Sequence, residues 1–302
     1  MTMKNTDSQI FGFLLGSCTV FTAALTIFFV GFIFYIAFPA FQSQGLYFLY
    51  GDVWSYSDKI FGLRNFIAGT IILTFVTMVI AFPVSLFTAI FLAEYAPRLV
   101  VNILRPMIEL LVGIPSVVYG IFGLFVLKDV FDHTINPFLD NYLGFIPIFV
   151  DYGYGGQGVL LASTVLAIMI LPTIITITED SLRSVSHAHR EASFALGANQ
   201  WQTIKKVVLP IAFRGIMLGA VLGIMRAMGE TMAIVMLLGN ISKVPGSVLD
   251  AGYAMTSKIL NDITYNLIDD ASRSALFGIA AVLFLMEIIV VAIARKIGGR
   301  PA

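Results

Sequence analysis

The sequence predicts an all-α integral membrane protein with six transmembrane helices. Of its 302 residues, 58% are hydrophobic and 12% are charged, and the mean hydropathy is +0.92. A soluble domain of this length cannot bury so much apolar surface in its core. A helix of about 20 apolar residues crosses a bilayer. Apolar stretches of this length cover residues 10–38, 65–93, 107–127, 158–178, 213–240 and 275–294.

The first stretch is expected to be a retained anchor. Lys4 precedes it, and no cleavage site of small residues follows a short apolar core, so a signal peptide is disfavoured. Pro83, Pro115 and Pro172 lie inside later stretches. Prolines of this kind are tolerated in membrane helices as kinks, because neighbouring helices satisfy the freed backbone groups. The single cysteine, Cys18, excludes an intrachain disulfide.

The distribution of Lys and Arg predicts the orientation, because cytoplasmic segments of membrane proteins carry an excess of both. With the N-terminus inside, eleven basic residues fall on the cytoplasmic side and six fall outside. The inner set is Lys4, Arg98, Arg105, Arg183, Arg190, Lys205, Lys206, Arg214, Arg295, Lys296 and Arg300, and the outer set is Lys59, Arg64, Lys128, Lys243, Lys258 and Arg273. We therefore expect both termini in the cytoplasm and long outer segments near 39–64, 128–157 and 241–274.

The longest cytoplasmic segment, 179–212, has the signals of two short helices. One helix can begin at Ser186 or His187 and run through Phe194, and Gly197 suits a left-handed helix exit. A second helix over 200–208 can stop at Pro210. One interpretation is an amphipathic hairpin that lies on the lipid surface. A specific spacing favours another interpretation. It runs Glu191-Ala192-Ser193, three residues, Gly197, nine residues, Val207, one residue, Leu209-Pro210.

This spacing resembles the EAA loop of ABC-importer permeases, with Ser in place of the third Ala and Val in place of an Ile. The resemblance implies a MetI-like membrane fold, and a loop that docks on a separate cytoplasmic ATPase. It assigns the coupling role to Glu191, Ala192, Gly197, Leu209 and Pro210. No segment matches G-x-x-x-x-G-K-[ST], which binds nucleotide phosphates. We therefore expect no cofactor on this chain, and ATP and Mg on the partner ATPase.

Two charged residues, Arg226 and Glu230, lie inside the apolar run GIMRAMGETMAIVMLLGN, residues 223–240. On a continuous helix they share one face, about 6 Å apart along the axis. Burying each at mid-bilayer costs about 3 kcal/mol. Two interpretations remain open: a buried ion pair that fixes helix register, and an anion contact in a transport pathway. In the second, Glu230 holds the planar guanidinium until an anion replaces it.

The stretch RAMGETMAIVMLLGN is similar to the PstC-type subunit of phosphate importers. Molybdate and sulfate permeases tend to show G-E-F-G-A at this place, and PstA-type subunits tend to continue G-E-T-A-P. A second stretch, ELLVGIPSVVYG over 109–120, resembles the same subunit, so the resemblance covers roughly residues 65–294. It makes Glu109, Ser116, Tyr119 and Thr231 pathway candidates beside the charged pair. Packing is the competing role for Ser116 and Tyr119.

The resemblance implies the transmembrane permease subunit of an ATP-driven phosphate importer in a bacterial inner (plasma) membrane. It implies a PstA-type permease, a PstB-type ATPase dimer, a PstS-type phosphate-binding protein and membrane lipid as partners. The competing interpretations are a permease for another oxyanion, such as molybdate or sulfate, a secondary transporter and a membrane-embedded enzyme. The coupling loop disfavours the secondary transporter. We expect the parts 1–64 (first helix and outer loop), 65–294 (permease core) and 295–302 (cytoplasmic tail).

We expect no catalytic residue, no metal site and no nucleic-acid partner. The three histidines do not converge, because His187 and His189 lie in the cytoplasmic segment and His133 lies outside. The net charge of zero does not predict nucleic-acid binding. Glu287 lies alone in the last apolar stretch. It is protonated, paired with another helix or functional, and the sequence does not rank these.

Overall fold

Long apolar helices make up most of the fold. The computed structural model describes residues 3–266 and 268–297, so the end of the predicted tail, 298–302, lies outside the described residues. Within these ranges, five helices are long and apolar enough to cross a membrane, or six if a sharply bent pair counts as one span. The five are α1 (Met3–Gln44), α3 (Arg64–Ile90) with its π-helical end η1 (Phe91–Tyr95), α8 (Val159–Arg183), α11 (Leu209–Gly229) with its preceding turns, and α14 (Asp270–Ile297).

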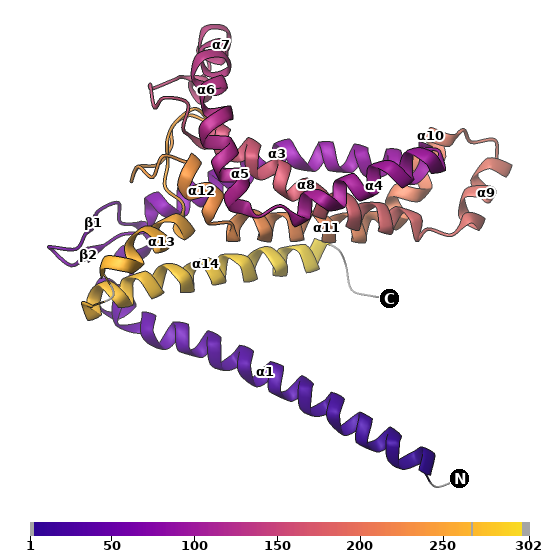
Figure 1. Cartoon of the computed structure of the whole chain (residues 1–302), viewed down its shortest axis with the longest axis horizontal. Coiled ribbons are helices and arrows are strands. Elements are labelled where there is room, and N and C mark those ends of the chain that lie inside the picture. The colour runs from indigo at the N-terminus through magenta and orange to yellow at the C-terminus, as the bar shows by residue number, and fades with distance from the viewer. Residues whose placement is uncertain (1–2, 267, 298–302) are drawn as a thin grey trace.

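Helix α1 separates from the rest of the chain. Figure 1 shows it meeting α14 near one end and diverging toward the N-terminus. One end of α1 is buried, where Ala37 and Ala40 pack and the Ala40 N–H donates to Ser274 Oγ at 2.8 Å. Residues 11–29 are mostly apolar and are all exposed. A helix of this composition suits a lipid environment or another membrane helix.

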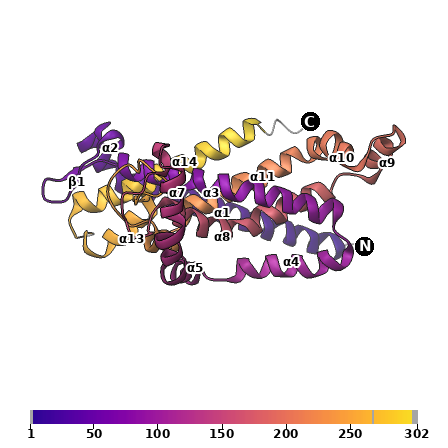
Figure 2. The same ribbon diagram turned by 90° about the horizontal axis from the view of Figure 1, so that it is seen from above.

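The central bundle consists of α3, α8 and α11, which lie side by side (Figures 1 and 2). Leu73 of α3 and Leu166 and Ile170 of α8 are fully buried in its core. Small residues allow close approach, as in many membrane helix pairs. A Cβ on Gly223 of α11 would lie 2.6 Å from the side chain of Ile174. The bundle is thus packed by apolar contact, with few polar links between its helices.

The third predicted span is broken rather than straight. Helix α4 (Arg98–Gly113) and the helical segment that begins with α5 (Ser116–Phe122) meet at an angle of 92°. Pro115 causes the break, because it has no N–H and holds the preceding Ile114 in an extended conformation (φ −75°, ψ 124°). Figure 2 shows α4 alongside the bundle, and Figure 1 shows the helical segment after α5 projecting away from it. The expectation of one helix over 107–127 is therefore wrong.

Helical turns continue into the segment expected as a loop over 128–157. They are η2 (Gly123–Leu127), α6 (Lys128–Val130), η3 (Phe131–Ile135), α7 (Asn136–Leu143) and the 3-10 turn η4 (Pro147–Phe149).

The fifth span also differs from its predicted bounds. A helix begins at α10 (Gln200–Thr203), passes through the π-helical turn η5 (Ile204–Val208) and continues as α11 to Gly229. The prediction that Pro210 stops the second short helix is wrong. Pro210 has no N–H for a helical hydrogen bond. The wider π-helical turn η5 directly precedes it and accommodates this gap, so the helix continues. After Gly229 the chain breaks and restarts as α12 (Met232–Leu237).

The outer segments fold against one another around a buried lysine. A hairpin of β1 (Trp54–Ser55) and β2 (Ile60–Phe61) follows α2 (Tyr47–Tyr50) and lies near α13 (Met255–Asn266). Lys258 of α13 is 8% exposed, and its Nζ lies 2.6 Å from Asp262 Oδ2. The rings of Trp54, Tyr56, Phe66 and Tyr253 surround the same Nζ at 5.1–5.5 Å. These cation–π contacts attach the hairpin to α13 and α3.

Candidate functional site

Arg226 lies in the last turn of α11 and reaches across to α8. Its Nη1 donates a hydrogen bond of 2.8 Å to Thr173 Oγ1, and both side chains are partly buried. Thr173 directly follows Pro172, the proline inside α8. The guanidinium is therefore held by a neutral hydroxyl on a neighbouring helix. The sequence did not indicate Thr173, because threonine in an apolar helix usually bonds within its own helix.

Glu230 does not share a helix face with Arg226, and the expectation of a paired face is wrong. The helix ends at Gly229, and Glu230 is extended (φ −67°, ψ 138°). Its Oε1 accepts from the Thr231 N–H at 3.1 Å, and its carbonyl accepts from Thr256 Oγ1 at 2.8 Å. In the part of the chain that the structure describes, no ion pair joins Arg226 to Glu230. The carboxylate instead satisfies a backbone donor freed at the break.

The break after α11 gathers further polar groups. Thr231 Oγ1 donates to the Gly229 carbonyl at 3.3 Å. Glu287 of α14 also lies at this break, because its Oε1 is 4.0 Å from the position that a Cβ on Gly229 would occupy. The sequence did not assign a role to Glu287, and the structure places it beside the end of α11.

The bend in the third span lies close to Arg226 as well. The Tyr119 hydroxyl donates to the Leu111 carbonyl at 3.0 Å, which joins α5 to α4 across the bend. The Tyr119 phenol is near enough to Arg226 for their electrostatics to couple. Helix α5 also packs closely on α12, because a Cβ on Gly120 would lie 3.2 Å from the Cα of Ala233. The bend therefore packs against α12 and lies within electrostatic range of Arg226.

The other two pathway candidates lie on the same broken span. Ser116 begins α5 and is partly buried, and Glu109 is exposed on α4. Among the residues that the structure covers, no ion pair joins Glu109 to Arg226. Their pathway roles stay predictions.

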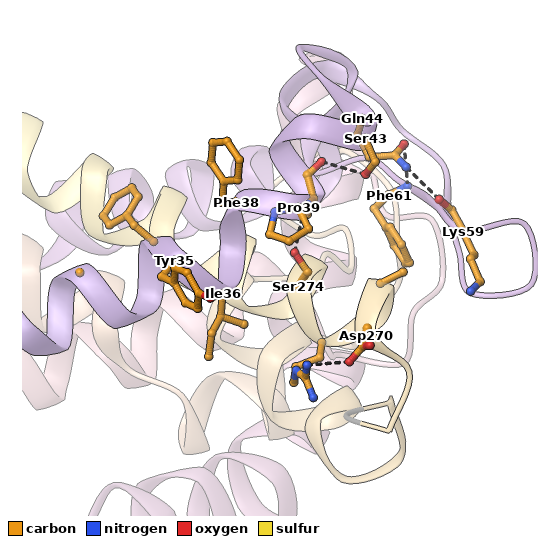
Figure 3. Close-up of a pocket in the computed structure, with 15 residues that line it drawn as sticks. Tyr35, Ile36, Phe38, Pro39, Ser43, Gln44, Lys59, Phe61, Asp270 and Ser274 are labelled. Atoms are coloured by element: carbon orange, nitrogen blue, oxygen red, sulfur yellow. Dashed lines mark hydrogen bonds and ion pairs between the residues drawn. The ribbon is translucent and has the colours of Figure 1, made fainter.

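A cavity of about 1020 Å³ lies elsewhere, between the outer ends of α1 and α14. Figure 3 shows its lining, which includes Tyr35, Phe38, Lys59 and Asp270 and none of the predicted pathway residues. Its walls are mostly apolar and come from α1, α14 and the β1–β2 hairpin. This cavity is separate from the Arg226 site.

The segment between α8 and α11 forms the first of the two predicted short helices, while the second, α10, runs on through η5 into α11. Helix α9 (His187–Ala195) begins after Ser186, whose side chain accepts from the Ala188 N–H. Gly197 adopts φ +82°, the left-handed conformation expected of it. Asn199 then starts α10 through a capping box with Gln202. Figure 1 shows α9 and α10 at the end of the bundle opposite the hairpin.

The surface of this loop is unusually apolar for an exposed segment. Leu196 is 89% exposed, and Phe194 and Trp201 are about half exposed. Glu191 and Ala192 are on α9 beside them, and Ala192 is exposed. Exposed apolar side chains of this kind mark interaction surfaces. Leu209 and Pro210 lie apart from it, in the first turn of α11.

A membrane helical bundle with two interrupted spans and a two-helix loop that exposes apolar side chains is typical of one class of protein, the transport permeases. Solved structures with this fold include a bacterial ABC transporter involved in the import of the acidic polysaccharide alginate. It gives a TM-score of 0.53 at 17% identity, covering 94% of this chain and 96% of that one. The MetNI methionine ABC transporter in inward-facing conformations gives 0.51 at 18% identity, covering 79% and 95%. The predicted MetI-like fold is thereby confirmed.

The chain belongs to the family described as binding-protein-dependent transport system inner membrane component, which it matches over residues 85–299. The phosphate transport system permease protein PstC of Xylella fastidiosa Temecula1 is 38% identical over 259 residues, covering 85% of this chain and 79% of that protein. PstC of Pasteurella multocida Pm70 is 35% identical over 260 residues, covering 85% and 80%. The probable ABC transporter permease protein YqgH of Bacillus subtilis 168 is 37% identical over 246 residues, covering 81% and 74%.

Proposed function

We propose that the chain is the PstC-type permease subunit of an ATP-driven importer of inorganic phosphate. The observation that carries the proposal is the position of Arg226. Its guanidinium lies where α11 ends, where α5 bends away from α4, and where α8 offers a hydroxyl. A planar fork of donors suits a tetrahedral oxyanion. The similarity to PstC proteins along most of the chain supports phosphate as that anion.

The structure supports a mechanism other than the one in which Glu230 holds Arg226 until an anion replaces the carboxylate. Thr173 is neutral and does not compensate the charge of the guanidinium, so a phosphate can engage it. Glu230 and Glu287 lie at the adjacent break. Two carboxylates near the arginine would limit how long an anion stays, which favours passage over retention. In this proposal Thr173 orients the guanidinium and the carboxylates speed release.

The chain acts with partners in this proposal. A PstA-type permease completes the pathway, a PstB-type ATPase dimer binds ATP and Mg, and a PstS-type protein delivers phosphate from outside. The exposed Leu196 and Trp201 on the cytoplasmic loop supply the apolar surface that meets the ATPase. The chain itself is a transport subunit without hydrolytic chemistry. It lies in the bacterial inner (plasma) membrane with both termini in the cytoplasm.

The test is uptake of labelled phosphate into proteoliposomes that contain the full importer. Arg226→Lys keeps the charge but loses the bidentate fork. Hydrogen bonds to charged groups contribute about 1.5–3 kcal/mol, so uptake should fall roughly 10- to 100-fold with normal assembly. Thr173→Val, which removes only the orienting bond, should cause a smaller loss. Normal uptake by an Arg226→Met variant, or uptake blocked by molybdate or sulfate at equal concentration, would contradict the proposal.

A further inference from the structure

A shielded ion pair lies at the cytoplasmic end of α3. Glu94 belongs to the π-helical end η1, and its side chain is 9% exposed. Arg190 lies in α9, and its side chain is 12% exposed. Both carboxylate oxygens face the guanidinium, with Oε1 2.7 Å from Nη2 and Oε2 3.4 Å from Nε. A two-point contact of this kind, partly removed from water, fixes orientation as well as distance.

The same guanidinium also binds the end of α8. Its Nη2 donates to the Leu182 carbonyl at 2.9 Å, and its Nη1 donates to the Val185 carbonyl. The last carbonyls of a helix lack donors within the helix, and the negative end of the helix dipole favours a cation. Arg190 therefore joins three elements, α3, α8 and α9, through one side chain.

The second helix of the loop makes a contact of its own with η1. Gln200 Nε2, at the start of α10, donates to the Glu94 carbonyl at 2.8 Å. Ser193 Oγ and Thr203 Oγ1 lie 2.9 Å apart and join α9 to α10. The coupling loop is thus attached to α3 at two points and is braced internally.

Helix α3 carries this attachment to the other side of the molecule. Together with η1 it runs for 32 residues, about 48 Å at 1.5 Å per residue. At its outer end Asn65 Nδ2 donates to the carbonyls of Asp52 and Ser242, at 3.0 and 3.2 Å. Thr70 Oγ1 accepts from the Met255 N–H at 3.0 Å. One helix therefore contacts the coupling loop at one end and two outer segments at the other.

We propose that Arg190 and Glu94 are positioning residues that make α3 follow α9. Movement of the docked loop then reaches the outer segments through α3 as well as through α8 and α11, the helices to which the loop is covalently joined. The proposal rests on the proposed docking of α9 on an ATPase. Without the ion pair, α9 can move with the ATPase while α3 does not move with α9.

The first measurement follows α9 and α3 directly. In the full importer carrying Cys18→Ser, spin labels at Tyr95→Cys and His189→Cys mark η1 and α9, since both side chains are exposed. We expect the distance between the labels to stay the same with and without trapped ATP and vanadate. Adding Glu94→Gln should make that distance change on trapping. This readout needs no transported solute, so it stands apart from the test of phosphate as substrate.

The second measurement is the number of phosphate ions taken up per ATP hydrolysed. Glu94→Gln and Arg190→Gln should each lower this ratio at least fivefold while the basal ATPase rate persists. The double variant should be no worse than the more affected single one, because the two residues act through one contact. Asp180→Asn is the matched control, since its ion pair with Arg105 joins α4 to α8 at the same end without touching the loop.

Two results would overturn the proposal. One is a label distance that changes on trapping when the ion pair is intact. The other is a Glu94→Gln variant that keeps both the constant distance and the parent ratio of uptake to hydrolysis. Should Glu94→Gln fail to assemble, Arg190→Lys gives the same two readouts, because it keeps the charge and loses the fork.

Discussion

Single charged side chains near the membrane are held by partners from distant parts of the sequence. Arg226 bonds Thr173 of α8, and Lys258 lies among aromatic rings from the hairpin, α3 and the segment before α13. Desolvation would make each charge costly without such a partner. At the outer surface, burial first and then the hydrogen bond with Asp262 raise the pKa of Tyr56 far above its ordinary value. The phenol therefore stays a proton donor to that carboxylate.

Asp269, just before α14, gives a prediction on pH dependence. Its carboxylate accepts from the Ser272 N–H at 3.0 Å and the Ser272 hydroxyl at 2.9 Å, and it lies 3.2 Å from Lys59 Nζ. These contacts, the backbone one first, lower the pKa of Asp269. The contact between Asp269 and Ser272 should therefore stabilise the start of α14 fully at pH values above about 3.9, the ordinary pKa of an aspartate. It should weaken only as the pH falls through the lowered pKa of Asp269.

The carboxyl carbon shift of Asp269 in ¹³C-aspartate-labelled protein measures this pKa. Asp269→Asn identifies the signal by its loss. A midpoint at or above about 3.9 would show that the contacts do not favour the charged form.

At the scale of elements, the interruptions in the helices organise the site. The bend at Pro115 and the break at Glu230 both expose backbone groups at membrane depth. Such groups must find partners inside the protein. Tyr119 satisfies a carbonyl at the bend, and Thr256 satisfies the Glu230 carbonyl at the break. Tyr119 thus repairs the bend and is also a predicted pathway residue, so a structural and a pathway role overlap at one side chain.

The coupling loop gives an element-scale prediction. Gly197 has φ +82°, and no atom lies within 4 Å of the point that a Cβ would occupy, so substitution strains the backbone without a clash. The left-handed conformation costs other residues about 1–2 kcal/mol, roughly a tenfold change in an equilibrium. Gly197→Ile should therefore displace α9 and bring ATP hydrolysis stimulated by the binding protein close to the basal rate.

Gly153 provides the matched control for this change. It has φ +77° and equally open space, but it lies between η4 and α8 on the outer side. Gly153→Ile should leave stimulated hydrolysis intact. Equal losses in both variants would mean that backbone strain alone, and not the position of α9, explains the effect.

At the scale of the whole molecule, the bundle separates two functional ends. The hairpin and α13 lie at one end, and α9 and α10 lie at the other (Figure 1). Helix α3 makes contacts at both. With the basic residues concentrated toward the α9 end, that end is expected in the cytoplasm.

Accessibility to a membrane-impermeant thiol reagent checks this orientation in spheroplasts of a Cys18→Ser strain. Phe145→Cys should react, because Phe145 is 81% exposed at the outer end. Lys206→Cys, exposed in η5, should react only after the membrane is permeabilised. The opposite pattern would place both termini outside.

The sequence predicted the apolar spans and the left-handed Gly197 from local signals, while the coupling role of the loop stays a prediction. Apolar length determines a span, and the left-handed Gly197 follows from its place after a short helix. Two errors arose at prolines, Pro115 and Pro210, whose effect depends on the turns around them, and one arose where α11 ends before Glu230. Pro210 does not end its helix because η5 widens the preceding turn, and Glu230 leaves the helix because its carboxylate binds the Thr231 N–H.

The sequence by itself determined the class of the protein, since apolar run lengths and the EAA spacing require no knowledge of what touches what. Only the tertiary structure decided which residues meet. It paired Arg226 with Thr173 instead of Glu230, placed Glu287 at the α11 break, and joined Arg190 to Glu94. Such pairings depend on how helices pack and where they break. Side chains from distant segments come together only when that packing is complete, and no spacing along the chain encodes it.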